Sequence, residues 1–170
     1  MNDISKNSLN VIRAPRLQLT TAGQASPPEL GEKVAALLKD FLAKENVEAA
    51  SILDVGCGLG NQMALIKERC PGCFGYVAGV DWSPATVNKH NSANNAIYNE
   101  MVLCSSDRLP YEAQKFDLAL SMENLEHLYE QDSIRAISEM MRVAKYIVIS
   151  TCLDWNECVI TGPSAEAVSR

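Results

Sequence analysis

The sequence predicts a doubly wound α/β fold built on a mostly parallel β-sheet, and two features of the 170-residue chain predict it. Short, nearly continuous apolar runs alternate with segments of helical periodicity, a pattern typical of parallel strands covered by helices on both faces. A glycine-rich segment, residues 56–60, directly follows the first of these runs. Doubly wound sheets bind their ligands at such places, beyond the carboxyl ends of the strands.

The predicted strands and helices alternate between residues 29 and 151. The first helix begins at Glu29, because Val34, Leu37, Leu38 and Leu42 recur on one helical face. Strands are expected at residues 50–55, 75–80, 101–104, 116–121 and 146–150. Further helices are expected after the glycine segment, from Pro84 with Ser83 as N-cap, and over residues 132–143. Right-handed crossovers between these strands place helices on both faces.

Three segments are expected along the chain. Residues 1–28 have no clear period and end in Ser26-Pro27-Pro28, which predicts an N-terminal arm or lid. Residues 29–151 form the ligand-binding domain, and residues 152–170 a short C-terminal tail. The 19 residues of this tail leave little room for further strands with a helix at ordinary connection lengths. We therefore expect either a sheet that is reduced at its C-terminal edge or a shortened chain.

Charge and hydropathy exclude two classes of partner. The net charge is -6, and lysines and arginines are scattered, so a nucleic-acid partner is not expected. The longest apolar runs fall short of the roughly 20 residues that span a bilayer. Residues 1–10 are polar and lack the apolar centre of a signal peptide. A cytoplasmic protein without a membrane span is therefore expected.

The glycine segment favours a ligand with an ammonium group. Gly56, Gly58 and Gly60 let the backbone turn tightly and approach a ligand closely. The dinucleotide fingerprint requires a third glycine where Asn61 stands, which disfavours an NAD-dependent oxidoreductase. Asp54, two residues before the segment, repels a pyrophosphate but suits the amino-acid end of S-adenosylmethionine (SAM).

Asp81 supports adenosine binding without choosing between the two cofactors. It ends the second predicted strand about 20 residues beyond the glycines, where an acid accepts hydrogen bonds from a ribose diol. SAM and NAD both carry such a diol.

Two motifs resemble those of class I SAM-dependent methyltransferases, among them the small-molecule and ubiquinone/menaquinone-type C-methyltransferases. Residues 52–60, ILDVGCGLG, are similar to the first motif, and residues 78–84, AGVDWSP, to the second. The resemblance covers roughly residues 30 to 151 and implies a Rossmann-like fold. It implies that residues 56–60, Cys57 included, wrap the methionine part of SAM, with Asp54 near its ammonium. It also implies that Asp81 holds the ribose and that Trp82 lies against the adenine, unless Trp82 only packs at the strand end.

The resemblance extends to the adenine edge with one departure. Residues 104–111, CSSDRLPY, are similar to the family segment that contacts the adenine. Ser105 stands where the family has an Asp, and Asp107 is the residue expected to substitute for it. Ser105, Ser106 and Asp107 are therefore predicted to line the cofactor site, together with Ser121 at the end of the fourth predicted strand.

Catalytic candidates follow that same strand. A methyl group moves by in-line displacement, and a base is needed when the nucleophile carries a proton. His127 is the candidate base, since imidazole titrates near neutral pH, unless it is only bonded to backbone at a helix start. Glu123 is the candidate substrate contact.

No metal site is expected. Cys70 and Cys73 have metal-ligand spacing, but the chain lacks a second such pair and the pair follows a helix end. The chain is therefore predicted to be a SAM-dependent methyltransferase acting on a small-molecule acceptor. The alternative is a SAM-binding or partner-binding module without turnover. The sequence gives neither the acceptor nor the oligomeric state.

Overall fold

A seven-stranded sheet organises the computed structural model, which describes residues 11–13, 28–92, 97–151 and 157–161. The strand order is β1-β7-β6-β5-β2-β3-β4. The five strands from β2 to β6 are mutually parallel. They are β2 (Ala50–Val55), β3 (Phe74–Asp81), β4 (Glu100–Leu103), β5 (Phe116–Met122) and β6 (Ala144–Ser150). The predicted fold class is confirmed, and each predicted strand is present within two residues of its expected bounds.

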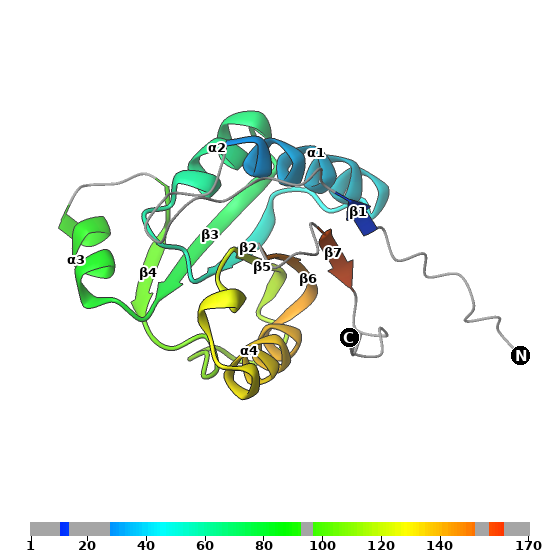
Figure 1. The fold of residues 1–170 in the computed structure, drawn as a ribbon. Helices are drawn as coiled ribbons and strands as arrows, with labels where there is room; N and C mark the ends of the chain where they lie inside the picture. The colour runs from blue at the N-terminus through cyan, green and yellow to red at the C-terminus, as the bar shows by residue number, and fades with distance from the viewer. Residues whose placement is uncertain (1–10, 14–27, 93–96, 152–156, 162–170) are drawn as a thin grey trace, which may run out of the picture.

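Helices cover both faces of the sheet (Figure 1). They are α1 (Pro28–Lys44), α2 (Asn61–Arg69), α3 (Pro84–Ser92) and α4 (Glu130–Val143), with a short 3-10 helix, η1 (Leu125–His127). α1 and α2 lie on one face, and α4 lies on the other (Figure 1). Ser83 caps α3 as predicted, since its Oγ accepts a hydrogen bond from the Thr86 N–H at 3.3 Å. Within the described segments, no helix combines the length and apolarity that crossing a membrane requires.

The strand order reverses between β2 and β5. From β2 the chain runs outward to β3 and β4, and then returns to place β5 and β6 on the other side of β2. In a doubly wound sheet the crevice at this reversal, beyond the carboxyl ends of the strands, is the place where ligands bind. β2 and β5 are parallel neighbours, so the topology brings residues 56–60 after β2 and residues 123–127 after β5 together at the carboxyl ends of the strands.

Two antiparallel strands extend the sheet beyond β6. β7 (Glu157–Thr161) pairs with β6, and β1 (Val11–Arg13) pairs with β7. Neither strand is predicted from the sequence, because three to five residues are too few to show a period. A sheet reduced at its C-terminal edge was one of the two expectations. In the described residues this edge carries two further strands, β7 from residues 157–161 and β1 from residues 11–13.

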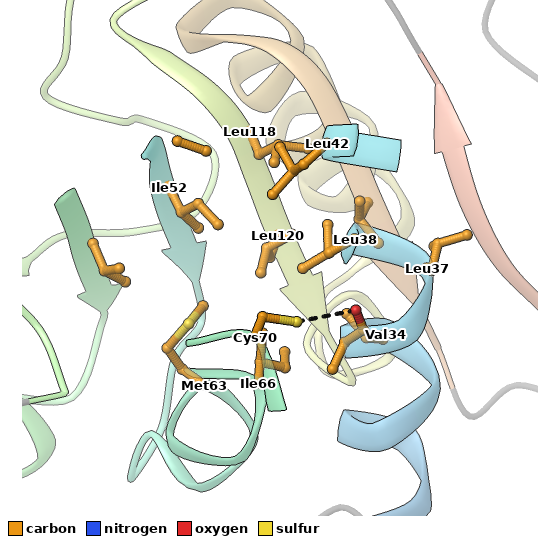
Figure 2. Packing of buried hydrophobic residues seen from close by; sticks show 14 of the residues in the cluster. Val34, Leu37, Leu38, Leu42, Ile52, Met63, Ile66, Cys70, Leu118 and Leu120 are labelled. Carbon is orange, nitrogen blue, oxygen red and sulfur yellow. Dashed lines mark hydrogen bonds between the residues drawn. The ribbon is translucent and has the colours of Figure 1, made fainter. Parts of the chain in front are cut away.

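The first hydrophobic cluster packs α1 and α2 against the sheet (Figure 2). Leu38 of α1, Ile52 of β2 and Leu120 of β5 are each 0% exposed. Burying one such side chain contributes roughly 1.5–3 kcal/mol. Cys70 belongs to this cluster, and its Sγ donates to the carbonyl oxygen of Ala35 at 3.2 Å. Cys70 is therefore a packing residue of this cluster.

The second cluster packs α4 against the other face and anchors residues 104–111, hereafter the adenine-edge segment. Arg142 of α4 donates to the carbonyl oxygens of Tyr111 at 2.6 Å and Leu109 at 3.0 Å. It also pairs with Glu139, which accepts a hydrogen bond from the Leu109 N–H at 2.8 Å. One helical turn thus binds the end of the segment through three backbone groups.

Replacing Arg142 by Met should loosen this segment. The change keeps the aliphatic stem but leaves two carbonyls and Glu139 without their donor, so we expect a loss of roughly 1–3 kcal/mol in the free energy of unfolding. Hydrogen exchange should show faster exchange at the Leu109 amide. Lys145→Met is the matched control, because Lys145 forms an exposed ion pair with Asp117, and such pairs contribute about 0–1 kcal/mol. Equal effects of the two changes would contradict this role for Arg142.

Candidate functional site

The glycine loop, residues 56–60, joins β2 to α2 and is tied to β3. The N–H groups of Gly56 and Cys57 both donate to the carbonyl oxygen of Val80, at 2.9 and 3.0 Å. Gly56, Gly58 and Gly60 have φ values of 72°, 52° and 76°. L-residues with side chains rarely adopt this left-handed region, so the backbone itself demands the glycines.

Two of these glycines also make room for neighbouring side chains. A Cβ on Gly56 would lie 2.2 Å from Cγ of Asn124, and one on Gly60 would lie 2.9 Å from Cε2 of Tyr98. A Cβ on Gly58 would meet no atom within 4 Å. Gly58 is therefore the loop position with open space beside its backbone.

Asp81 lies at the end of β3, beside the loop. Its Oδ2 accepts a hydrogen bond from the Gly58 N–H at 3.0 Å, and its Oδ1 accepts one from the Ser83 N–H at 2.8 Å. A carboxylate offers about four acceptor sites, so each oxygen keeps capacity for a ribose hydroxyl. The next residue, Trp82, is 76% exposed and presents an open aromatic surface at the same strand end. Both residues lie where the sequence predicts them.

Asp54 lies in β2, two residues before the loop, and is only 2% exposed. Its Oδ2 accepts a hydrogen bond from the Tyr98 hydroxyl at 2.6 Å. Burial raises the pKa of Asp54 from 3.8 to about 7; the Tyr98 hydrogen bond lowers the pKa and the charge of Asp81 raises it. Burial and the Asp54 charge in turn raise the pKa of Tyr98 well above its usual range. An acid perturbed in this way marks a candidate functional site.

Tyr98 and His90 are site residues that the sequence motifs do not reveal. His90 of α3 is 6% exposed, and its Nε2 lies 3.0 Å from the carbonyl oxygen of Gly58. The two rings meet edge to face with centroids 5.2 Å apart. Tyr98 is 44 positions from Asp54, and no local spacing links them. The sheet brings them together because α3 crosses over between β3 and β4.

The adenine-edge segment carries a charged group. The Ser105 hydroxyl donates to Asp107 Oδ1, and Arg135 Nε lies 3.5 Å from Asp107 Oδ2. The Ser105 hydrogen bond, aided by Arg135, lowers the pKa of Asp107. The structure thus couples Ser105 to Asp107, the residue predicted to substitute for it as the adenine contact.

Asn124 joins three parts of the site. Its Nδ2 donates to Ser121 Oγ at 3.3 Å and to Ser106 Oγ at 3.2 Å, and its side chain fills the space above Gly56. Ser121 and Ser106 are both buried. Two of the three predicted serines, Ser106 and Ser121, therefore belong to one hydrogen-bonded group that Asn124 links beyond the end of β5.

The catalytic candidates lie on the segment after β5. Glu123 has φ 51°, and its N–H donates to the carbonyl oxygen of Ser150 at 3.0 Å, which ties the turn to β6. A non-glycine residue in the left-handed region is uncommon and often occurs at a functional turn. His127 ends η1, and its side chain is exposed. Both residues follow the carboxyl end of β5, where the sequence predicts them. Their catalytic roles stay predictions.

Comparison with known proteins agrees with this arrangement. A family model described as a methyltransferase domain matches residues 52–146. The chloroplastic tocopherol O-methyltransferase of Arabidopsis thaliana is 29% identical over 118 residues, which cover 64% of this chain and 32% of that protein. The ubiquinone/menaquinone biosynthesis C-methyltransferase UbiE of Xanthomonas oryzae pv. oryzae is 27% identical over 160 residues, which cover 92% of this chain and 53% of that protein. The chain spans about a third to a half of the length of these relatives.

Among solved structures, the fold is similar to SAM-bound CalS10, an amino pentose methyltransferase from Micromonospora echinaspora. The TM-score is 0.58 at 19% identity, and the match covers 75% of this chain and 51% of that chain. At this identity the likeness shows the fold alone, whereas the family model matches more than half of the chain. The chain therefore belongs to the methyltransferase domain family, with the fold of the class I SAM-dependent methyltransferases that its motifs resemble.

Proposed function

We propose that this chain binds SAM beside the glycine loop and transfers the methyl group to a small-molecule acceptor at the ends of β5 and β6. One observation carries the proposal. Two buried carboxylates flank the glycine loop in the fold: Asp54 precedes it in β2, and Asp81 of β3 accepts a hydrogen bond from the N–H of Gly58, beside which there is open space. A cationic, amino-acid-bearing nucleoside suits this arrangement, whereas a pyrophosphate would meet two negative charges.

Each part of the site fits one part of SAM. Asp81 has acceptor capacity for the ribose hydroxyls, and the exposed ring of Trp82 offers a face to the adenine. Asp107, held ionised by Ser105 and Arg135, is the acceptor for the adenine amino group. Asp54 and the loop hold the amino-acid end. When bound, SAM supplies an electrophilic methyl group on a sulfonium.

The acceptor side is formed by the residues after β5. Glu123 and His127 follow the strand whose end lies beside the glycine loop, so an acceptor held there would face the methyl group. We assign Glu123 to acceptor binding and His127 to removal of the acceptor proton. Two relatives named as methyltransferases of tocopherol and of ubiquinone/menaquinone biosynthesis support a small-molecule acceptor. The net charge of -6 argues against nucleic acid.

The cofactor assignment is tested by calorimetric titration of SAM and S-adenosylhomocysteine into the wild-type chain and an Asp81→Ala variant. The variant loses two hydrogen bonds between a charged acceptor and the ribose, so we expect binding at least ~100-fold weaker. Asp40→Ala is the matched control, because Asp40 is an exposed acid on α1 and its loss should leave affinity unchanged. A folded wild-type chain that binds neither ligand would refute the proposal.

If His127 is the base, replacing it should change the rate of methyl transfer but not the affinity for SAM. His127→Gln should leave SAM affinity unchanged and lower the rate of methyl transfer to a hydroxylated acceptor by roughly 10²-fold or more. Initial rates with isotope-labelled SAM and a panel of phenols and quinols measure this loss. An unchanged rate would remove His127 from the mechanism. Binding of SAM without transfer to any acceptor would indicate a binding module instead of an enzyme.

A further inference from the structure

The Tyr98 side chain contacts Asp54, the candidate acid for the ammonium group. Its hydroxyl lies 2.6 Å from Asp54 Oδ2, and Asp54 is 2% exposed. A carboxylate accepts hydrogen bonds at both oxygens, so this bond leaves acceptor sites for an ammonium group. The hydroxyl is therefore placed to orient the carboxylate without replacing the ligand.

The surrounding backbone is shaped to admit the Tyr98 ring. A Cβ on Gly60 would lie 2.9 Å from Tyr98 Cε2, and a Cβ on Gly79 of β3 would lie 3.1 Å from Tyr98 Cδ1. His90 packs edge to face on the ring and also contacts the carbonyl oxygen of Gly58. One aromatic ring thus fits against two elements of the cofactor site through positions that lack side chains.

We propose that Tyr98 is a positioning residue of the cofactor site, whose hydroxyl orients the Asp54 carboxylate for the ammonium group of SAM. The inference rests on the proposed function. It adds a residue, Tyr98, that determines how the site recognises the amino-acid end of SAM. Tyr98 acts through Asp54, so its effect is confined to ligands that carry the ammonium.

The groups around Asp54 determine the sign of the pH dependence. Asp54 interacts with Tyr98, Asp81 of β3 and Cys57 of the loop, and His90 of α3 packs edge to face with the Tyr98 ring. Burial raises the pKa of Asp54 to about 7, and the Tyr98 hydrogen bond lowers it. Removing the hydroxyl therefore raises the pKa further, and the ionised form that binds the ammonium is reached only at higher pH.

The test compares two ligands across pH. SAM carries the ammonium, whereas 5′-methylthioadenosine has the same adenine and ribose but lacks the amino-acid end. Both are titrated by calorimetry into wild-type, Tyr98→Phe and Tyr146→Phe protein from about pH 5.5 to about pH 7.5, where an α-amino group with a pKa of about 7.7–8.0 stays mostly protonated. Tyr146 is the matched control, because its hydroxyl donates to Glu45 Oε2 at 3.2 Å near the amino end of β6.

For Tyr98→Phe we expect SAM binding near neutral pH to weaken about tenfold or more, with the rise in affinity moved to higher pH. Binding of 5′-methylthioadenosine should stay within about twofold, and Tyr146→Phe should change neither ligand. Asp54→Asn, which keeps an acceptor for Tyr98, should remove the rise in SAM affinity with pH.

Three results would overturn the inference. In the first, Tyr98→Phe weakens the binding of both ligands equally and does not change the pH dependence of SAM binding, which would show that the role of Tyr98 is purely structural. The second is unchanged SAM binding by Tyr98→Phe, and the third is a pH rise that persists in Asp54→Asn. Absence of SAM binding to the wild-type chain is a different result, because it refutes the proposed function itself.

Discussion

A buried carboxylate two residues before the glycine loop is the constraint on which the candidate site depends. Removing a carboxylate from water costs several kcal/mol unless hydrogen bonds or charges compensate for it. At Asp54 the Tyr98 hydroxyl compensates in part, while the charge of Asp81 opposes ionisation. The result is a pKa of about 7, at which the acid is poised between its two states near neutral pH. A cationic ligand would complete the compensation.

Several features of the chain follow from accommodating this acid and its partner. Gly60 and Gly79 lack side chains where the Tyr98 ring lies, and His90 packs edge to face with that ring. Asp81 is stabilised separately, by the N–H groups of Gly58 and Ser83. Because Gly58 N–H bonds to Asp81 and the Gly58 carbonyl contacts His90, the loop is held from both sides and its outer face stays open.

The sequence predicts the features that depend on local pattern. The five parallel strands appear as apolar runs, and α1 appears as an apolar helical face that is buried in the structure. The glycine loop, Asp54 and Asp81 are recognisable because their spacing along the chain is itself the motif. Ser105 and Asp107 are found in the same way, although their mutual hydrogen bond required the structure.

The remaining features depend on contacts between distant segments. Tyr98 and Asn124 reach the glycine loop only after the strands have assembled, and neither lies in a spacing that points to the loop. The anchoring of the adenine-edge segment by Arg142 joins residues more than thirty positions apart. β1 and β7 are too short to show a period, and their pairing joins the two ends of the chain.

The most direct test of the buried acid is the unfolding free energy of Asp54→Asn against wild type as a function of pH. Below about pH 4 the acid is protonated in both folded and unfolded chains, so the two proteins should be nearly equal. Between about pH 4 and pH 7, Asp54 is ionised in the unfolded chain but still largely protonated in the folded chain, so the free energy of unfolding of wild type should fall as pH rises. The variant has no acid at this position and should keep that stability. Above pH 7 the variant should therefore be more stable than wild type by a few kcal/mol. A variant that is no more stable than wild type at pH 8 would contradict the account, because Asp54 would then be ionised at no cost.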